Sequence, residues 1–90
     1  MDPIRKRIVF YGAVQGVGFR YRACCAADAV GATGWVRNEY DGSVTMEIQG
    51  TGQQIDSVIN AIARGRYVLI EDMSVKQIPV VEDEYFFHER

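Results

Sequence analysis

A glycine-rich segment near the N-terminus places the strongest constraint on how this chain folds. It reads Gly12-Ala13-Val14-Gln15-Gly16-Val17-Gly18-Phe19-Arg20 and separates a strand-like stretch from a helix-like one. Glycine adopts positive φ and carries no side chain, so successive backbone N–H groups can converge on one point. A helix that begins directly afterwards adds its positive end. The segment therefore predicts a sharp strand-to-helix turn that cradles a phosphate or carboxylate; the alternative is a tight connection without a ligand.

The cradle does not match either common nucleotide-binding motif. It lacks the Lys-Ser/Thr ending of a P-loop, and its glycines do not have the G-x-G-x-x-G spacing. We therefore expect a small anion or part of a small molecule. Arg20 follows the loop at once, and its planar guanidinium can make two parallel hydrogen bonds to phosphate oxygens. The alternative for Arg20 is a surface residue beside a helix start.

The first half of the chain predicts a strand, a helix and a hairpin. Residues 7–14 alternate with apolar groups on both faces, which indicates a central strand. Residues 21–30 carry small residues at helical spacing, and Gly31 is placed to end that helix in the left-handed conformation. Residues 35–40 and 43–49 predict two strands joined by a turn at Asp41-Gly42. Residues 43–49 alternate as a strand with one buried and one solvated face.

The second half predicts a helix and two more strands. Ile55, Val58, Ile59 and Ile62 form one apolar stripe on a helix that Gly65 can terminate. Residues 68–75 return to strand-forming types, and residues 85–87 supply a last edge strand. The order β-α-β-β-α-β predicts an α+β fold, a ferredoxin-like α/β sandwich with both helices on one face of a four-stranded antiparallel sheet.

Composition bounds the class of protein. The 90 residues are 48% hydrophobic and 24% charged, with a net charge of -2, which is typical of one ordinary soluble domain spanning residues 1–90. No apolar run approaches the roughly 18 residues of a membrane span, and residues 1–7 lack the apolar core of a signal peptide. We expect a cytoplasmic protein without a membrane partner.

Two local features carry weaker signals. Arg5, Lys6 and Arg7 form a short basic run, but the sequence pI of about 5.3 argues against a broad polyanion surface, so we expect a solvated strand start.

Cys24 and Cys25 are adjacent, which is poor geometry for a disulfide, and His88 is the single histidine. We therefore expect free thiols without a metal or redox role.

A second polar constellation precedes the hairpin turn. Gly34-Trp35-Val36-Arg37-Asn38 ends just before Asp41-Gly42. The side-chain amide of Asn38 both accepts and donates, so it can orient a water molecule beside a bound phosphate. The alternative is an asparagine that merely ends a strand.

Taken together, V-Q-G-V-G-F-R (residues 14–20), G-W-V-x-N (residues 34–38) and D-G (residues 41–42) resemble the acylphosphatase family. The resemblance is close from about residue 7 to residue 50. The chain departs from the family after Gly65, where Arg66-Tyr67 replaces the usual Gly-Pro-containing turn, and at Ala32, where a bulkier apolar residue is common.

This resemblance implies hydrolysis of small acyl phosphates to a carboxylate and orthophosphate, with no metal and no cofactor. It implies that Arg20 binds the phosphoryl group and that Asn38 positions the attacking water. It also implies that the cradle is lined by the backbone amides of Gln15, Gly16, Val17, Gly18, Phe19 and Arg20. The chemistry is consistent, because a carboxylate leaving group, with a conjugate-acid pKa of about 4, needs no general acid.

Two other functions stay open at this point. The first is a non-catalytic phosphate or carbamoyl-phosphate binding module, because a similar domain begins larger hydrogenase-maturation carbamoyltransferases. The second is a ferredoxin-like RNA binder, which needs exposed aromatic rings such as Phe10, Tyr11 and Trp35 on the central strands. The acidic charge balance disfavours RNA, so we expect no nucleic-acid partner and a monomer.

Overall fold

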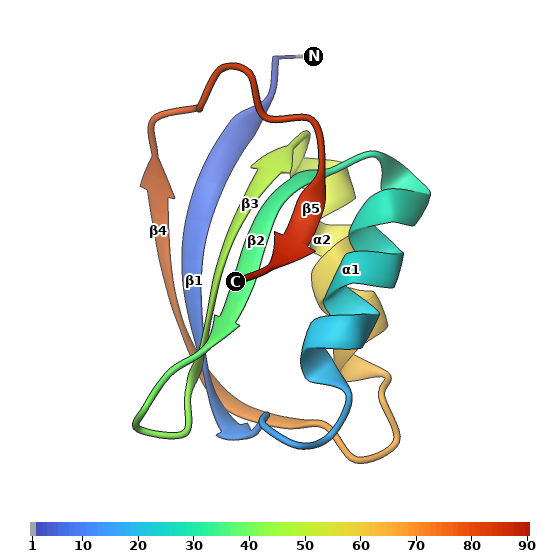
Figure 1. Ribbon diagram of the computed structural model, residues 1–90, viewed down its shortest axis with the longest axis vertical. Coiled ribbons are helices and arrows are strands. Elements are labelled where there is room, and N and C mark those ends of the chain that lie inside the picture. Colours follow the sequence, from blue (N-terminus) through green and yellow to red (C-terminus); the bar gives the residue numbers. More distant parts are fainter. Residues whose placement is uncertain (1) are drawn as a thin grey trace.

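Five strands and two helices make up the computed structural model, which describes residues 2–90 (Figure 1). In chain order they are β1 (Ile4–Ala13), α1 (Phe19–Val30), β2 (Thr33–Asn38), β3 (Val44–Gly50), α2 (Gly52–Ala63), β4 (Leu69–Ile78) and β5 (Phe87–Glu89). Both helices cover the same face of the sheet, and the other face carries no helix (Figure 1). The predicted β-α-β-β-α-β order and the ferredoxin-like sandwich are confirmed.

The sheet has the strand order β4-β1-β3-β2-β5. Strand β1 pairs antiparallel with both β3 and β4, and β2 pairs antiparallel with β3, as predicted for the four main strands. The short strand β5 joins the edge of β2 in the parallel direction, which makes the five-stranded sheet mixed. Strand β1 has neighbours on both sides, so the predicted central position is confirmed, although Tyr11 on its helix-free face stays 40% exposed.

One hydrophobic core fills the space between the sheet and the helices. The stripe predicted for α2 is confirmed, since Ile55, Val58 and Ile62 are fully buried and Ile59 packs against them. The rings of Phe10 and Phe19 meet edge to face with centroids 4.9 Å apart, which ties β1 to the start of α1. Neither helix in residues 2–90 is long and apolar enough to cross a membrane.

The helix ends differ in how well the sequence predicts them. Gly31 ends α1 in the left-handed conformation, with φ 78°, as predicted. The expectation that Gly65 ends α2 is wrong, because the helix stops at Ala63 and its C-cap, Arg64, has right-handed dihedrals. Gly65 is needed for space instead: a Cβ there would lie 2.7 Å from a Val68 methyl and 2.8 Å from Arg22 Nε.

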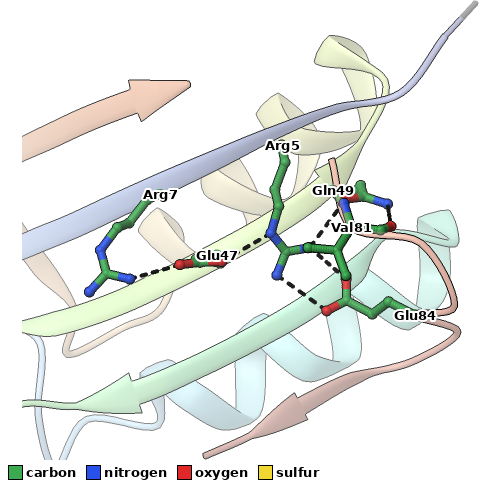
Figure 2. A network of polar contacts seen from close by, with 6 residues as sticks. All are labelled: Arg5, Arg7, Glu47, Gln49, Val81 and Glu84. Atoms are coloured by element: carbon green, nitrogen blue, oxygen red, sulfur yellow. Dashed lines mark hydrogen bonds and ion pairs between the residues drawn. The ribbon is translucent and has the colours of Figure 1, made fainter. Parts of the chain in front are cut away.

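Arg5 corrects the expectation of a solvated basic run. Its side chain is only 2% exposed on the helix-free face of the sheet. The guanidinium donates to Glu47 Oε1 at 3.0 Å and to Glu84 Oε1 at 2.7 Å (Figure 2). Burial works against the charged form of Arg5, but the hydrogen bonds to Glu84 and Glu47 outweigh it and raise its pKa. Arg5 therefore fastens the connection between β4 and β5 onto the sheet.

The outer face of β3 is less exposed to solvent than predicted. Ser43 and Thr45, expected on the solvated face, are 4% and 2% exposed. Gln49 exchanges two hydrogen bonds with the backbone of Val81, at 2.8 and 2.9 Å, and so holds the connection against β3 (Figure 2). Alternation within one strand predicts its inner face. The outer face near Gln49 is covered by a segment distant in the sequence, whereas Thr45 donates to Glu39 of the preceding hairpin.

Candidate active site

The glycine-rich loop joins the end of β1 to the start of α1. Gly16 and Gly18 have φ values of 71° and 81°, and Gly18 is the N-cap of α1. A Cβ at either glycine would meet no atom within 4 Å, so glycine is required for its backbone conformation and not for space. Gly18, the N-cap, offers no side chain to the first N–H groups of α1. The positive end of the helix is thus available to an anion.

The side chain of Gln15 anchors this loop. Its Nε2 donates to the backbone oxygens of Glu39 at 2.7 Å and Ser43 at 2.9 Å. Both acceptors belong to the hairpin between β2 and β3, where Asp41 also accepts two hydrogen bonds from Ser43. The loop and the strand end that carries Asn38 are therefore held together. The sequence offered no signal for this role.

A hollow of about 170 Å³ lies beside the loop. Its lining brings together the two residues predicted for catalysis, Arg20 and Asn38, and three more of the predicted cradle, Gly16, Gly18 and Phe19. Val14, Tyr21 and Glu89 complete the lining. Val17 packs against the hydrophobic core, and the Gln15 side chain reaches the hairpin. That their amides contact phosphate stays a prediction.

Asn38 lines this hollow and carries an unsatisfied acceptor. It is the last residue of β2 and is half-buried. Within residues 2–90, its buried Oδ1 atom has no hydrogen-bond partner. A buried carbonyl oxygen without a partner costs free energy, so such an atom calls for an explanation in ligand or water binding. An acceptor in this position can take a hydrogen bond from a water molecule.

Glu89 is a site residue that the sequence analysis missed. It pairs with Val36 in the parallel β5–β2 ladder, and its Oε1 lies 3.5 Å from Nε of Arg20. The two side chains are 50% and 40% exposed. Residues two positions apart in a strand share a face, so the buried Phe87 places Glu89 on the helix-covered face. This is the one signal in the sequence for Glu89. The register of β5 on β2, which brings Glu89 to Arg20, is not encoded locally.

Cys24 lies near the site but lacks the character of a nucleophile. Burial raises the pKa of its thiol, and the carboxylates of Glu89 and Asp28 act in the same direction, against a smaller opposite effect of Arg20. A protonated thiol is a poor nucleophile. Cys24 and Cys25 are both free thiols. In the part of the chain that the structure describes, no group of three His, Cys, Asp or Glu side chains gathers to hold a metal ion.

The fold is that of a ferredoxin-like domain, and its strand-to-helix turn, with Arg20, borders a hollow of about 170 Å³. The family model for acylphosphatase matches residues 6–88. An acylphosphatase of Bifidobacterium longum is 40% identical over 81 residues, covering 89% of this chain and 84% of that protein. One of Oceanobacillus iheyensis is 45% identical over 69 residues, covering 74% and 76%. The crystal structure of acylphosphatase from Bacillus subtilis superposes with a TM-score of 0.87, at 33% identity, covering 97% and 98% of the two chains.

This chain belongs to the acylphosphatase family. It is a hydrolase acting on acid anhydrides, and its reaction is cleavage of the carboxyl–phosphate bond of small acyl phosphates to a carboxylate and orthophosphate.

Proposed function

We propose that this chain hydrolyses acyl phosphates without a metal, with Arg20 and the loop amides binding the phosphoryl group and Asn38 positioning the attacking water. One observation carries the proposal. Arg20, the loop glycines and Asn38 line the same hollow of about 170 Å³, and the buried Oδ1 of Asn38 has no hydrogen-bond partner within residues 2–90. A phosphoryl group held by Arg20 and the start of α1 then has beside it an acceptor for a hydrogen bond from the attacking water.

The roles of these groups follow from the charge of the reacting phosphoryl group. Its transition state is loose and spreads negative charge over the equatorial oxygens, so positioning and electrostatic stabilisation supply most of the acceleration. The guanidinium of Arg20 offers charged N–H donors to those oxygens. The backbone N–H groups of Gly18 and Phe19 at the helix start are fixed by the fold and need no reorganisation.

The bonds that change need little proton transfer from the protein. Water held by Asn38 attacks phosphorus while the bond from phosphorus to the acyl oxygen breaks, and the carboxylate departs with that electron pair. The proton released by the water ends on orthophosphate or in solvent. Because the departing carboxylate is a weak base, a site whose lining has no His or Cys is sufficient.

The same proposal covers the partners of the chain. The residues proposed to act on the substrate all belong to this chain. We propose a monomer of residues 1–90 that acts on a freely diffusing substrate in the cytoplasm. We propose no nucleic-acid partner. Of the three rings that an RNA-binding sheet would offer, Phe10 is fully buried, Trp35 is 5% exposed and only Tyr11, at 40%, is open to solvent.

Hydrolysis of benzoyl phosphate in the presence of a chelator tests the proposal. We expect turnover by the native chain and a loss of about 100-fold or more in Arg20→Gln, by analogy with removal of one oxyanion donor. Arg64→Gln, at an exposed position beyond α2, is the matched control and should keep native turnover. Near-native turnover by a folded Arg20→Gln variant would refute the role of Arg20. Phosphate binding without any turnover by the native chain would instead indicate a binding module.

A further inference from the structure

A second hollow lies on the face of the sheet that the helices leave open. Its volume is about 400 Å³, larger than that of the candidate active site. Its lining comes from β1, β2, β3 and β5, from the connection before β5 and from the residue after it. The residues are Arg5, Arg7, Trp35, Arg37, Glu47, Val81, Glu84, His88 and Arg90. Its volume is within the range of small-molecule sites, roughly 300 to 1,000 Å³.

The lining is basic although the chain is acidic. It contains four arginines and two glutamates, whereas the whole chain has a net charge of -2. Arg5 is fully engaged, because its guanidinium meets Glu47, Gln49 and Glu84 (Figure 2). The excess positive charge therefore comes from the other three arginines.

Arg7, Arg37 and Arg90 surround one aromatic ring. Their guanidinium carbons lie 5.7, 5.1 and 4.7 Å from the ring centroid of Trp35. Contact with an aromatic ring attracts a guanidinium and restricts its position. Three like charges that would otherwise repel each other are in this way held around a single side chain.

These three arginines keep donors free for a ligand. Arg7 meets Glu47 only through Nη1, and Arg37 meets Glu39 only through Nη2, although each guanidinium has five N–H donors. Their side chains stay 42% and 40% exposed. Arg90 has no ion pair with any carboxylate in residues 2–90.

We propose that this open-face hollow is a second anion site, separate from the catalytic one, that binds a small ligand carrying several phosphate groups. Planar guanidinium groups are suited to phosphate oxygens. Three guanidinium groups around one ring can pair with several anionic groups at once, so a ligand with several phosphates fits better than a single phosphate. Trp35 is almost fully covered, so the ligand contacts the guanidinium groups and does not stack on the indole.

The hollow also contains its own reporter. Trp35 is the single tryptophan of the chain and lies beneath the three arginines, on the opposite face of the sheet from the catalytic cradle. A ligand that displaces or reorders the guanidinium groups changes the surroundings of the indole. Tryptophan fluorescence therefore reads this hollow and not the catalytic one.

Titration of the Arg20→Gln variant of residues 1–90 with tripolyphosphate, followed by tryptophan fluorescence, tests the proposal. This background weakens binding at the catalytic cradle, and tripolyphosphate does not absorb at the excitation wavelength. We expect a saturable change, with orthophosphate at least tenfold weaker because it offers one anionic group. Adding Arg7→Gln and Arg90→Gln together should weaken tripolyphosphate at least tenfold. Adding Arg64→Gln and Arg66→Gln, which remove the same charge outside this hollow, should not.

Two outcomes would overturn the proposal. One is the absence of any saturable fluorescence change with tripolyphosphate at low ionic strength. The other is equal weakening by the two pairs of variants, which would mean that only net charge matters. Calorimetry on the same proteins gives a second readout of binding. The double variant Arg7→Gln, Arg90→Gln with a native Arg20 should still hydrolyse benzoyl phosphate. This turnover shows independently that the double variant folds.

Discussion

The Arg20 guanidinium and the Glu89 carboxylate meet across the candidate active site, with Nε and Oε1 3.5 Å apart. Strand β5 brings the acid there by pairing in parallel with β2, and the Arg5 network on the other face fastens the segment that leads into β5 (Figure 2). The residue proposed to bind the phosphoryl group thus has an anionic partner already. A bound phosphate and Glu89 compete for the same cation.

We therefore expect Glu89→Gln to tighten phosphate binding. An ion pair this exposed contributes about 0.4 to 1 kcal/mol, so the inhibition constant of orthophosphate should fall about two- to fivefold. The effect should shrink as ionic strength rises. Inhibition of benzoyl phosphate hydrolysis by orthophosphate measures it, with Glu82→Gln, an exposed acid of the β4–β5 connection, as the control. Weaker binding in Glu89→Gln would show instead that Glu89 holds Arg20 in its binding position.

Asn38→Ala should separate catalysis from binding. If the amide positions water, its loss affects the transition state and not the bound ground state, so kcat should fall about 100-fold while the inhibition constant of orthophosphate is retained. Asn60→Ala, at an exposed position of α2, is the matched control and should leave both unchanged. A weakened orthophosphate constant with native kcat would make Asn38 a binding residue.

Two glycine substitutions should act in opposite directions on stability. Gly18→Ala forces a side chain into a left-handed conformation, with φ 81°, and should lower the free energy of unfolding by about 1 kcal/mol. Gly52→Ala, in the first turn of α2 with open space around it, should raise that free energy by about 0.5 kcal/mol. Urea unfolding at constant pH measures both. Stabilisation by both substitutions would contradict the proposed strain at the start of α1.

Glu84 should make stability depend on pH. Burial works against its ionisation, but the hydrogen bonds from Arg5 outweigh burial and hold the pKa of Glu84 below its usual value. Because the folded-state pKa is depressed, the unfolded chain binds more protons as the medium becomes acidic. The contribution of Glu84 is therefore present above about pH 4.3 and is lost as pH falls through the folded-state pKa.

Glu84→Gln should remove this pH dependence. At pH 7 the free energy of unfolding should fall by about 2 kcal/mol, because hydrogen bonds to charged groups contribute about this much. The further loss between pH 7 and pH 3 should be smaller than in the native chain, and Glu82→Gln should retain the native slope. Urea unfolding across this range is the measurement. An unchanged slope in Glu84→Gln would assign the acid sensitivity to other carboxylates, such as Glu39 and Asp41, whose pKa values are also lowered by hydrogen bonds.

The sequence determined the elements whose signals are local. Alternation in residues 43–49 and the apolar stripe of α2 predicted their buried faces, because the spacing of side chains follows directly from the periods of strand and helix. Gly31 and Asp41-Gly42 marked a helix end and a hairpin, since backbone preferences depend on the residue itself. The glycine-rich loop with Arg20, and the motif that contains Asn38, also predicted five of the residues that line one hollow: Gly16, Gly18, Phe19, Arg20 and Asn38.

Only the tertiary structure decided what meets across the fold. Arg5 lies 42 positions from Glu47 and 79 from Glu84 in the sequence, so nothing in its own neighbourhood predicted a buried ion-pair network where a solvated run was expected. The same holds for Gln15 on the hairpin and for Glu89 at Arg20. Such contacts depend on strand order and register, which are set by packing of the whole core. All the core residues together specify that packing, and no single residue of the sequence reveals it.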